Sequence, residues 1–444
     1  MNPLDIADQI RSIITTDIVG SVVETTGVTV SAAGFAAPIG AMAEIRARGE
    51  KPIPAEVVGF QNNTAILFPY AQTHGVRHGD EVRLVRSSLS LSIGDHVLGN
   101  VLDAQGNILD YDRRSADSLK TTSARRVPFC RRAPKAHERP RITQTVATGI
   151  RAIDALLTLG AGQRVGIFAG SGVGKSVLLG MIARYTSADV IVIGLIGERG
   201  REVNDFIERD LGENGLKRSV LVVATSDEPA IVRVRAAQTA TVVAEYFRDQ
   251  GKNVLLLMDS LTRFALAQRE IGLASGEPAG RGGYPPSVFA LLPPLVERAG
   301  RTQNGDITAI YTVLVEGDDE NEPIADAVRG LLDGHIWLSR KLAQEAHYPA
   351  IDIPRSISRL MNDICPGKQC EAANYVREMI ATWREYQDIV AIGAYRKGTN
   401  RKLDLALEKR EQITRFLRQK MNESSTPAQT IAELEAISGV ATTH

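Results

Sequence analysis

The segment Ala-Gly-Ser-Gly-Val-Gly-Lys-Ser, residues 169–176, decides how this chain folds and what it can bind. It follows an apolar run at residues 165–168 and precedes a helix-forming stretch at 176–185. Between a strand and a helix, such glycines let backbone N–H groups surround phosphate oxygens, and the helix N-terminus adds partial positive charge. The pattern predicts a phosphate loop, although Ala169 stands where the motif usually begins with glycine.

Two side chains of this loop have expected chemical roles. Lys175 is placed to contact the β- and γ-phosphates of a nucleotide, and the hydroxyl of Ser176 can bind Mg²⁺. A chance glycine-rich turn is the alternative, but the strand before it and the helix after it argue for phosphate binding. The residues expected to bind the nucleotide are Gly170, Ser171, Gly172, Val173, Gly174, Lys175, Ser176 and Val177.

Further apolar runs follow the loop at residues 190–196, 220–223, 254–258 and 307–315. Helix-forming stretches separate them. Fully apolar strands alternating with helices are typical of a parallel sheet covered on both faces. We therefore expect an α/β fold.

Two of these runs are followed by carboxylates at the sheet edge where phosphates would lie. Asp259 follows residues 254–258 and can hold Mg²⁺ directly or through water; a helix N-cap is the alternative. Glu198 follows residues 190–196 and can orient the water that attacks a γ-phosphate. For Glu198 the alternative is a surface ion pair with a neighbouring arginine. Arg199, beside it, can steady phosphate charge or the geometry of the glutamate.

The regions before and after the sheet have different patterns. Residues 20–92 contain short segments rich in Val and Ile between turn residues, which indicates a small closed β-domain. Residues after Cys370 have helical spacing, including a stretch at 403–421. An apolar stripe at residues 4–14 indicates a short helix that either packs on its own domain or docks a partner.

Composition excludes several classes of protein. Lys plus Arg and Asp plus Glu both number 52, so the chain has no net charge and is not built mainly to coat nucleic acid. The three cysteines lack CxxC spacing and predict neither a disulfide framework nor a zinc ribbon. No apolar run is long enough for a membrane span, and residues 1–17 lack signal-peptide features, so we expect a cytoplasmic protein.

The stretch at residues 111–141 is basic, with ten Lys and Arg against three Asp and Glu. Because its apolar periodicity is weak, we expect a solvated, irregular connector. Contact with acidic lipid or an acidic partner is the alternative that its charge leaves open.

Several motifs together resemble a known family. Gly-Glu-Arg-Gly-Arg-Glu-Val at 197–203 and Met-Asp-Ser-Leu-Thr-Arg-Phe at 258–264 are similar to the rotary ATP synthase superfamily. Arg-Glu-Ile-Gly-Leu-Ala at 269–274 and Gly-Tyr-Pro-Pro-Ser-Val-Phe at 283–289 resemble the type III protein-export ATPases, with the flagellar members nearest. The resemblance covers about residues 20–420.

This resemblance implies roles that spacing alone does not show. Glu198 matches the catalytic glutamate, and Arg359 matches an arginine finger supplied across a subunit boundary. Tyr348 matches an aromatic residue that stacks on adenine, with a core tyrosine as the alternative. Arg263 matches an arginine near the site whose role stays open. The cofactors implied are ATP and Mg²⁺, with Asp259 and Ser176 as metal ligands.

The resemblance also implies an architecture, which is a RecA-like, parallel-sheet P-loop NTPase core between a β-barrel and a helical domain. The expected parts are a partner-docking helix at 1–18, a barrel at 19–95, the ATPase domain at 96–369 and a helical domain at 370–444. The loop at 276–284 would face the centre of a ring, and we assign it no role. Residues 316, 318 and 319 form an acidic cluster that is either a γ-phosphate sensor or a solvated turn.

The function implied is ATP hydrolysis that energises type III export at the flagellar base, at the inner membrane. Lys175, Glu198 and Arg359 share one chain, so a finger acting in trans implies a homo-oligomer, with a homohexamer expected. Implied partners are a stator-like regulator at the N-terminal helix, a central stalk protein, export chaperones and a membrane gate, with no nucleic acid. Virulence secretion is the near alternative, and a Rho-type nucleic-acid motor is more distant because residues 20–92 have few aromatics and no basic cluster.

Overall fold

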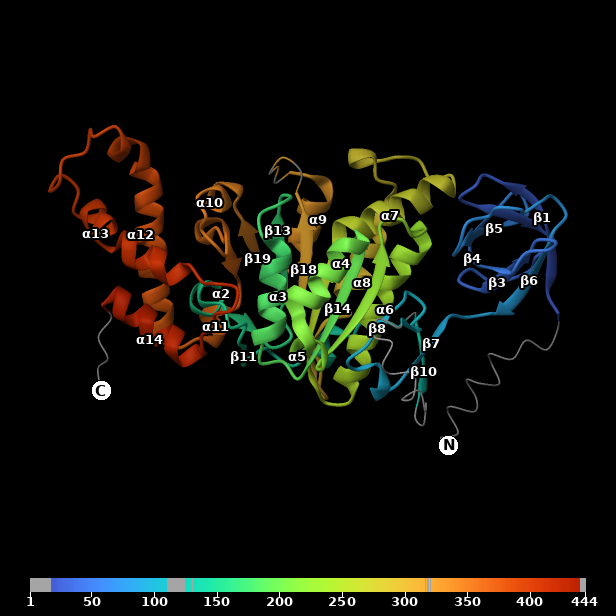
Figure 1. The fold of residues 1–444 in the computed structure, drawn as a ribbon, viewed down its shortest axis with the longest axis horizontal. Coiled ribbons are helices and arrows are strands. Elements are labelled where there is room, and N and C mark those ends of the chain that lie inside the picture. The colour runs from blue at the N-terminus through green and yellow to red at the C-terminus, as the bar shows by residue number, and fades with distance from the viewer. Residues whose placement is uncertain are drawn as a thin grey trace.

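The computed structural model describes residues 17–109, 124–129, 131–315, 317, 319 and 321–439. Three parts follow one another along its longest axis: a β-barrel, a sheet layered with helices, and a group of helices (Figure 1). The layered sheet therefore lies between the barrel and the C-terminal helices. The predicted N-terminal helix falls almost wholly outside the described residues, as do residues 316 and 318 of the acidic cluster.

Six antiparallel strands close into a barrel, in the order β1-β2-β5-β4-β3-β6. Inward side chains such as Val30, Ile45 and Leu67 are fully buried and form a core of their own. The small closed β-domain is therefore confirmed. The bounds are β1 Val19–Thr25, β2 Val30–Ala33, β3 Met42–Arg46, β4 Ile53–Gln61, β5 Thr64–Pro69 and β6 Glu81–Arg86.

The central sheet has the order β20-β19-β13-β18-β16-β14-β15-β8-β9, and its middle strands are parallel. The predicted apolar runs all lie in these middle strands, which confirms the α/β fold. Their bounds are β13 Arg164–Ala169, β14 Val190–Glu198, β15 Ser219–Thr225, β16 Asn253–Asp259, β18 Asp306–Leu314 and β19 Gly334–Leu338. The edge strands are β8 Val101–Leu102, β9 Ile108–Leu109 and β20 Ile357–Ser358.

Helices cover both faces of this sheet and make two separate apolar cores. In β14, Ile191 and Ile193 enter the core beneath α3, whereas Val192 enters the core on the opposite face. Burial on both faces explains why the strands are continuously apolar. The helix α3 Lys175–Tyr185 lies on the first face, and α6 Ala230–Asp249, α7 Leu261–Ala274, α8 Pro286–Val296 and α9 Pro323–Leu331 lie on the second.

The C-terminal part contains α12 Gly367–Ala391, α13 Arg401–Leu417 and α14 Pro427–Ser438. The helix expected to reach residue 421 ends earlier, at Leu417, because the next carbonyl groups accept hydrogen bonds from arginines of the central part. None of the helices in the described ranges is both long and apolar enough to cross a membrane.

The basic connector is more ordered than its sequence indicated. Arg125–Pro128 forms the strand β10, which pairs with β7 Ser90–Ile93, and Phe129 is buried. Arg131 forms a 2.8 Å ion pair with Asp249 at the end of α6. The expectation of a wholly solvated, irregular segment is therefore wrong, since part of its charge is paired with the core.

Candidate active site

The phosphate loop joins the end of β13 to the start of α3, as its sequence predicted. Gly172 and Gly174 have φ of 79° and 90°, in the left-handed region that favours glycine. Within the described chain, no side chain caps the N-terminus of α3, so its first N–H groups can bind an anion. Val173 is buried in the core, so only its backbone can contact a nucleotide. The loop fits a phosphate ligand.

Lys175, Asp259 and Glu198 meet beside this loop. The Lys175 ammonium forms an ion pair with the Asp259 carboxylate and lies 3.5 Å from Oε1 of Glu198. Thr312 of β18 donates a 2.6 Å hydrogen bond to Oδ1 of Asp259. The three groups follow parallel strands, whose carboxyl ends lie at one edge of the sheet, and this shared edge brings them together.

The structure decides between the alternatives for the two carboxylates. Asp259 is not the N-cap of α7, because Ser260 occupies that position and accepts the N–H of Arg263. Glu198 pairs with Lys175 rather than with its neighbour, and Arg199 instead forms a 3.7 Å ion pair with Glu202. Both carboxylates therefore lie at the phosphate loop, in contact with Lys175.

Burial changes the protonation equilibria of these groups. Burial raises the pKa of Glu198; the Lys175 ammonium opposes this and the Asp259 carboxylate adds to it, so the net shift is upward. Burial lowers the pKa of Lys175, but the two carboxylates outweigh burial and the pKa is raised overall. A carboxylate with a raised pKa accepts a proton more readily, so Glu198 suits a base.

A cavity of about 860 Å³ opens over the phosphate loop. Its lining includes Lys175, Ser176, Glu198 and the exposed Arg199. Arg263, whose role the sequence left open, lies in the same wall. The loop residues that line the cavity are Gly170, Ser171, Gly172, Gly174, Lys175, Ser176 and Val177.

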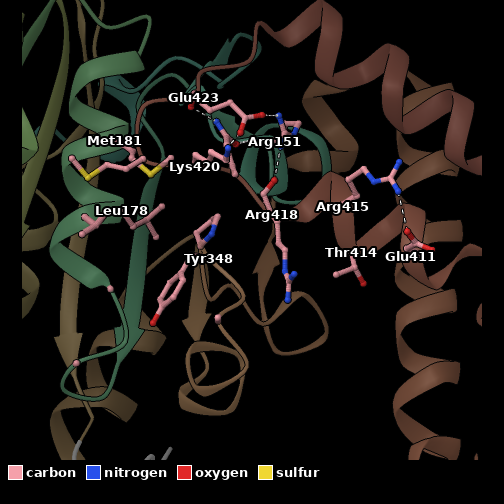
Figure 2. A pocket seen from close by; sticks show the side chains of 17 residues that line it. Arg151, Leu178, Met181, Tyr348, Glu411, Thr414, Arg415, Arg418, Lys420 and Glu423 are labelled. Atoms are coloured by element: carbon pink, nitrogen blue, oxygen red, sulfur yellow. Dashed lines mark hydrogen bonds and ion pairs between the residues drawn. The ribbon is translucent and has the colours of Figure 1, made fainter.

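A second cavity, of about 960 Å³, is lined by Gly172 and Gly174 of the same loop and by residues of α3 and the C-terminal part (Figure 2). Figure 2 shows Tyr348 between α3, which carries Leu178 and Met181, and the chain at Arg418. Tyr348 is 46% exposed, so it is not a core tyrosine, and its ring also lies against Gly174. An apolar wall beside an available ring suits a nucleobase.

The segment 418–425 contributes residues 418–421 and Glu423 to the far wall of this second cavity, and no sequence pattern predicted this role. Gln419 is buried and accepts the N–H of Arg151 at 2.9 Å. It donates a 2.7 Å hydrogen bond to the carbonyl of Gly149, and its own N–H donates to the carbonyl of Tyr348. The segment therefore joins the C-terminal helices to the predicted nucleobase residue.

Arg359 lies at the amino ends of the parallel strands, whereas the phosphate loop lies at their carboxyl ends. Its N–H donates to the carbonyl of Asp333, whose carboxylate contacts Arg164, the first residue of β13. The phosphate loop follows the last residue, Ala169, roughly 17 Å away along the strand. The exposed Arg359 therefore cannot reach the phosphates held by its own chain.

Family models match three successive regions of the chain. They are the β-barrel domain of the ATP synthase alpha/beta family at 18–85, the nucleotide-binding domain of that family at 149–358, and the T3SS EscN ATPase C-terminal domain at 365–436. The flagellum-specific ATP synthase of Bacillus subtilis is 49% identical over 422 residues, which is 95% of each chain. The chain belongs to the family of flagellar and type III secretion ATPases.

Other family members agree with this chain over nearly their whole length. The type 3 secretion system ATPase of Xanthomonas euvesicatoria is 47% identical, covering 94% of this chain and 93% of that protein. The assembled ATPase EscN of the enteropathogenic E. coli type III secretion system superposes with a TM-score of 0.89 at 44% identity. That match covers 94% of this chain and all of EscN, and EscN in complex with its central stalk EscO gives a TM-score of 0.86.

Proposed function

We propose that this chain hydrolyses ATP to energise type III protein export at the base of the bacterial flagellum. The observation that carries the proposal is the meeting of Lys175, Asp259 and Glu198 beside a glycine loop that fits phosphate. Family membership supports both ATP hydrolysis and export. ATP hydrolysis would release export substrates from chaperones and help deliver them to a membrane gate.

Each part of the phosphate site has a separate task in this proposal. The loop N–H groups and the Lys175 ammonium hold the phosphates. Bound phosphates would compete with the Asp259 and Glu198 carboxylates for this ammonium. Ser176 and Asp259 would hold Mg²⁺, which neutralises phosphate charge when bound. Among the described residues, no cluster of three or more His, Cys, Asp or Glu side chains could hold a metal. Mg²⁺ bound through one carboxylate usually completes its ligands with phosphate oxygens and water.

Glu198 is proposed to orient and deprotonate the attacking water. Its raised pKa and its place beside Lys175 support a base close to the γ-phosphate. Arg199 lines the same cavity and is proposed to assist with phosphate charge. Tyr348 is proposed to stack on the nucleobase in the second cavity.

Arg359 is proposed to act on the phosphates of a neighbouring subunit. Its position at the far edge of its own sheet supports action in trans, which requires a second copy of the chain. We propose a homohexameric ring, and both this requirement and the likeness to assembled EscN support an oligomer of identical chains. Because EscN forms a complex with its stalk EscO, we propose a central stalk partner here as well.

The remaining assignments extend the same proposal. We place the protein in the cytoplasm, at the inner membrane, with a stator-like regulator on the N-terminal helix, export chaperones as further partners and no nucleic acid. We also propose the domain division at 1–18, 19–95, 96–369 and 370–444. The family models that begin at residues 18 and 365 support two of its boundaries, and the third, at 149–358, lies within the proposed ATPase domain.

Virulence secretion is the second candidate, because relatives of both kinds are similar. The flagellum-specific ATP synthase of Treponema pallidum is 50% identical and a Pseudomonas syringae type 3 secretion system ATPase is 47% identical. Deletion of the gene in its own host, complemented with the wild-type chain or with Lys175→Ala, tests the choice. Swimming restored by the wild-type chain alone is expected, and normal swimming of the deletion strain would exclude the flagellar role.

A further inference from the structure

The cavity over the phosphate loop continues along α7, beyond the groups assigned to hydrolysis. Residues at helical spacing on α7 form this wall, and Tyr284 and Glu322 from other parts of the chain also line it. Arg269 lies six residues after Arg263, about 9 Å along the helix axis. The lining residues of this extension are Thr262, Arg263, Leu266, Arg269, Tyr284 and Glu322.

The two arginines in this wall form no ion pair within the part of the chain that the structure describes, although the charge of Glu198 acts on Arg263 at longer range. Among the described residues, neither Arg263 nor Arg269 has a carboxylate within 4.0 Å, and Nε of Arg263 is buried without a hydrogen-bond partner. The guanidinium of Arg269 lies 5.5 Å from the centre of the Tyr284 ring. A half-buried guanidinium that lies over an aromatic face and forms no ion pair among the described residues still has N–H donors available for an anion.

The acidic side chains of the same cavity are already engaged. Glu198 pairs with Lys175, and Glu202 pairs with Arg199. Glu322 accepts the hydroxyl of Tyr284 at 3.3 Å and the N–H of Ala325 at 2.7 Å. None of the three forms an ion pair with Arg269, so among the described residues no ion pair balances the charge of Arg269.

We propose that Arg269 forms a second anion site, which binds inorganic phosphate after hydrolysis and before release. The inference rests on the proposed ATP hydrolysis. While ADP keeps its β-phosphate at the loop, the cleaved phosphate moves along the same cavity, which α7 lines with Arg263 and Arg269. A guanidinium presents paired N–H donors that match phosphate oxygens. Arg269 contacts Tyr284, the last residue of the loop at 276–284, so phosphate bound to Arg269 would lie close to the end of that loop.

Inhibition of the ATPase by inorganic phosphate tests this site. The full chain is assayed with added phosphate at constant ionic strength, as wild type, Arg269→Gln, Arg269→Lys and Arg281→Gln. Arg281 is the matched control, because it is exposed, pairs with Asp326 and lies outside the cavity wall. We expect the inhibition constant for phosphate to rise about tenfold in Arg269→Gln, less in Arg269→Lys, and not in Arg281→Gln.

Two results would overturn the site: a wild-type inhibition constant in Arg269→Gln, or an equal rise in Arg281→Gln. A second measurement needs no turnover, because inorganic phosphate is titrated by calorimetry into the ADP-bound chain. Phosphate binding that depends on Arg269 in a chain without ATPase activity would contradict the proposed function alone. Hydrolysis with phosphate binding that is independent of Arg269 would contradict the anion site alone. Unchanged ADP affinity of each variant serves as the folding control.

Discussion

The phosphate side and the nucleobase side of the site are built in different ways. Lys175, Asp259 and Glu198 each follow a strand of one parallel sheet, so strand order alone brings them together. On the nucleobase side, Tyr348 faces a segment that is held by hydrogen bonds between residues as far apart as Gly149 and Gln419. In the proposed function, hydrolysis therefore depends on one edge of the sheet, whereas recognition of the base depends also on the C-terminal helices.

This difference separates the expected effects of mutations. Changes on the sheet edge should stop turnover and leave the fold intact, because each group acts on phosphate. Changes around the segment 418–425 should weaken nucleotide binding, because they move a wall of the pocket. The two sides can thus be distinguished by comparing kcat with KM.

The largest effect is expected for Lys175→Ala, which removes the ammonium that would contact the phosphates. Turnover should fall by about four orders of magnitude, to background. Steady-state hydrolysis of ATP measures this, with the exposed Lys402→Ala as the matched control. Hydrolysis by Lys175→Ala within tenfold of wild type would remove the loop lysine from the site.

Arg359→Ala should lower kcat about a thousandfold while ADP affinity stays at the wild-type value, since a finger stabilises charge that develops in the transition state. Mixing Arg359→Ala with Lys175→Ala chains should restore activity, because some interfaces then combine an intact loop with an intact finger. Differently tagged chains, purified together, establish that mixed rings form. Verified mixed rings without activity would contradict action in trans.

Gln419→Leu tests the nucleobase side with a smaller expected effect. The substitution leaves the Gly149 carbonyl and the Arg151 N–H without their partner in a buried place. We expect KM for ATP to rise about tenfold with a smaller change in kcat, because the wall behind Tyr348 shifts. The exposed Gln412→Leu on α13 is the control. A loss in kcat alone would place Gln419 on the catalytic side.

Asp154 offers the smallest effect, on stability rather than on activity. Its carboxylate accepts the N–H groups of Thr148 and Gly149 and so shapes the loop that holds Gln419. Burial raises the pKa of Asp154 from 3.8 to about 6, against the lowering by these hydrogen bonds. The native state therefore binds this proton more tightly than the unfolded state does. The protonated Asp154 carboxyl contributes fully to the free energy of unfolding below pH 3.8, and this contribution is lost as the pH rises through about 6.

Urea unfolding at pH 4 and pH 7 measures this contribution, which is on the order of 3 kcal/mol. The asparagine in Asp154→Asn cannot titrate. The free energy of unfolding of this variant should therefore decrease less between pH 4 and pH 7 than that of the wild type. An identical pH dependence in the variant and the wild type would show that Asp154 does not titrate in this range.

The sequence predicted the phosphate side because local pattern and strand order are enough to place it. A strand, a glycine loop and a helix locate Lys175, and carboxylates after apolar runs must reach the same edge. The segment 418–425 could not be predicted, because its conformation depends on arginines more than two hundred residues away, such as Arg151. For the same reason the helical spacing predicted too long a helix for α13, and the pairing of Arg125–Pro128 with β7 was not predicted.

The most direct test of the central claim is a comparison of ATP binding and ATP cleavage in Glu198→Gln. Single-turnover mixing with radiolabelled ATP measures cleavage, and equilibrium titration on the same sample measures binding. The amide keeps the size of the side chain but cannot accept the proton of the water, so we expect wild-type affinity and cleavage slowed by about two to four orders of magnitude. Cleavage at the wild-type rate would contradict the claim that Lys175, Asp259 and Glu198 act together on one bound nucleotide.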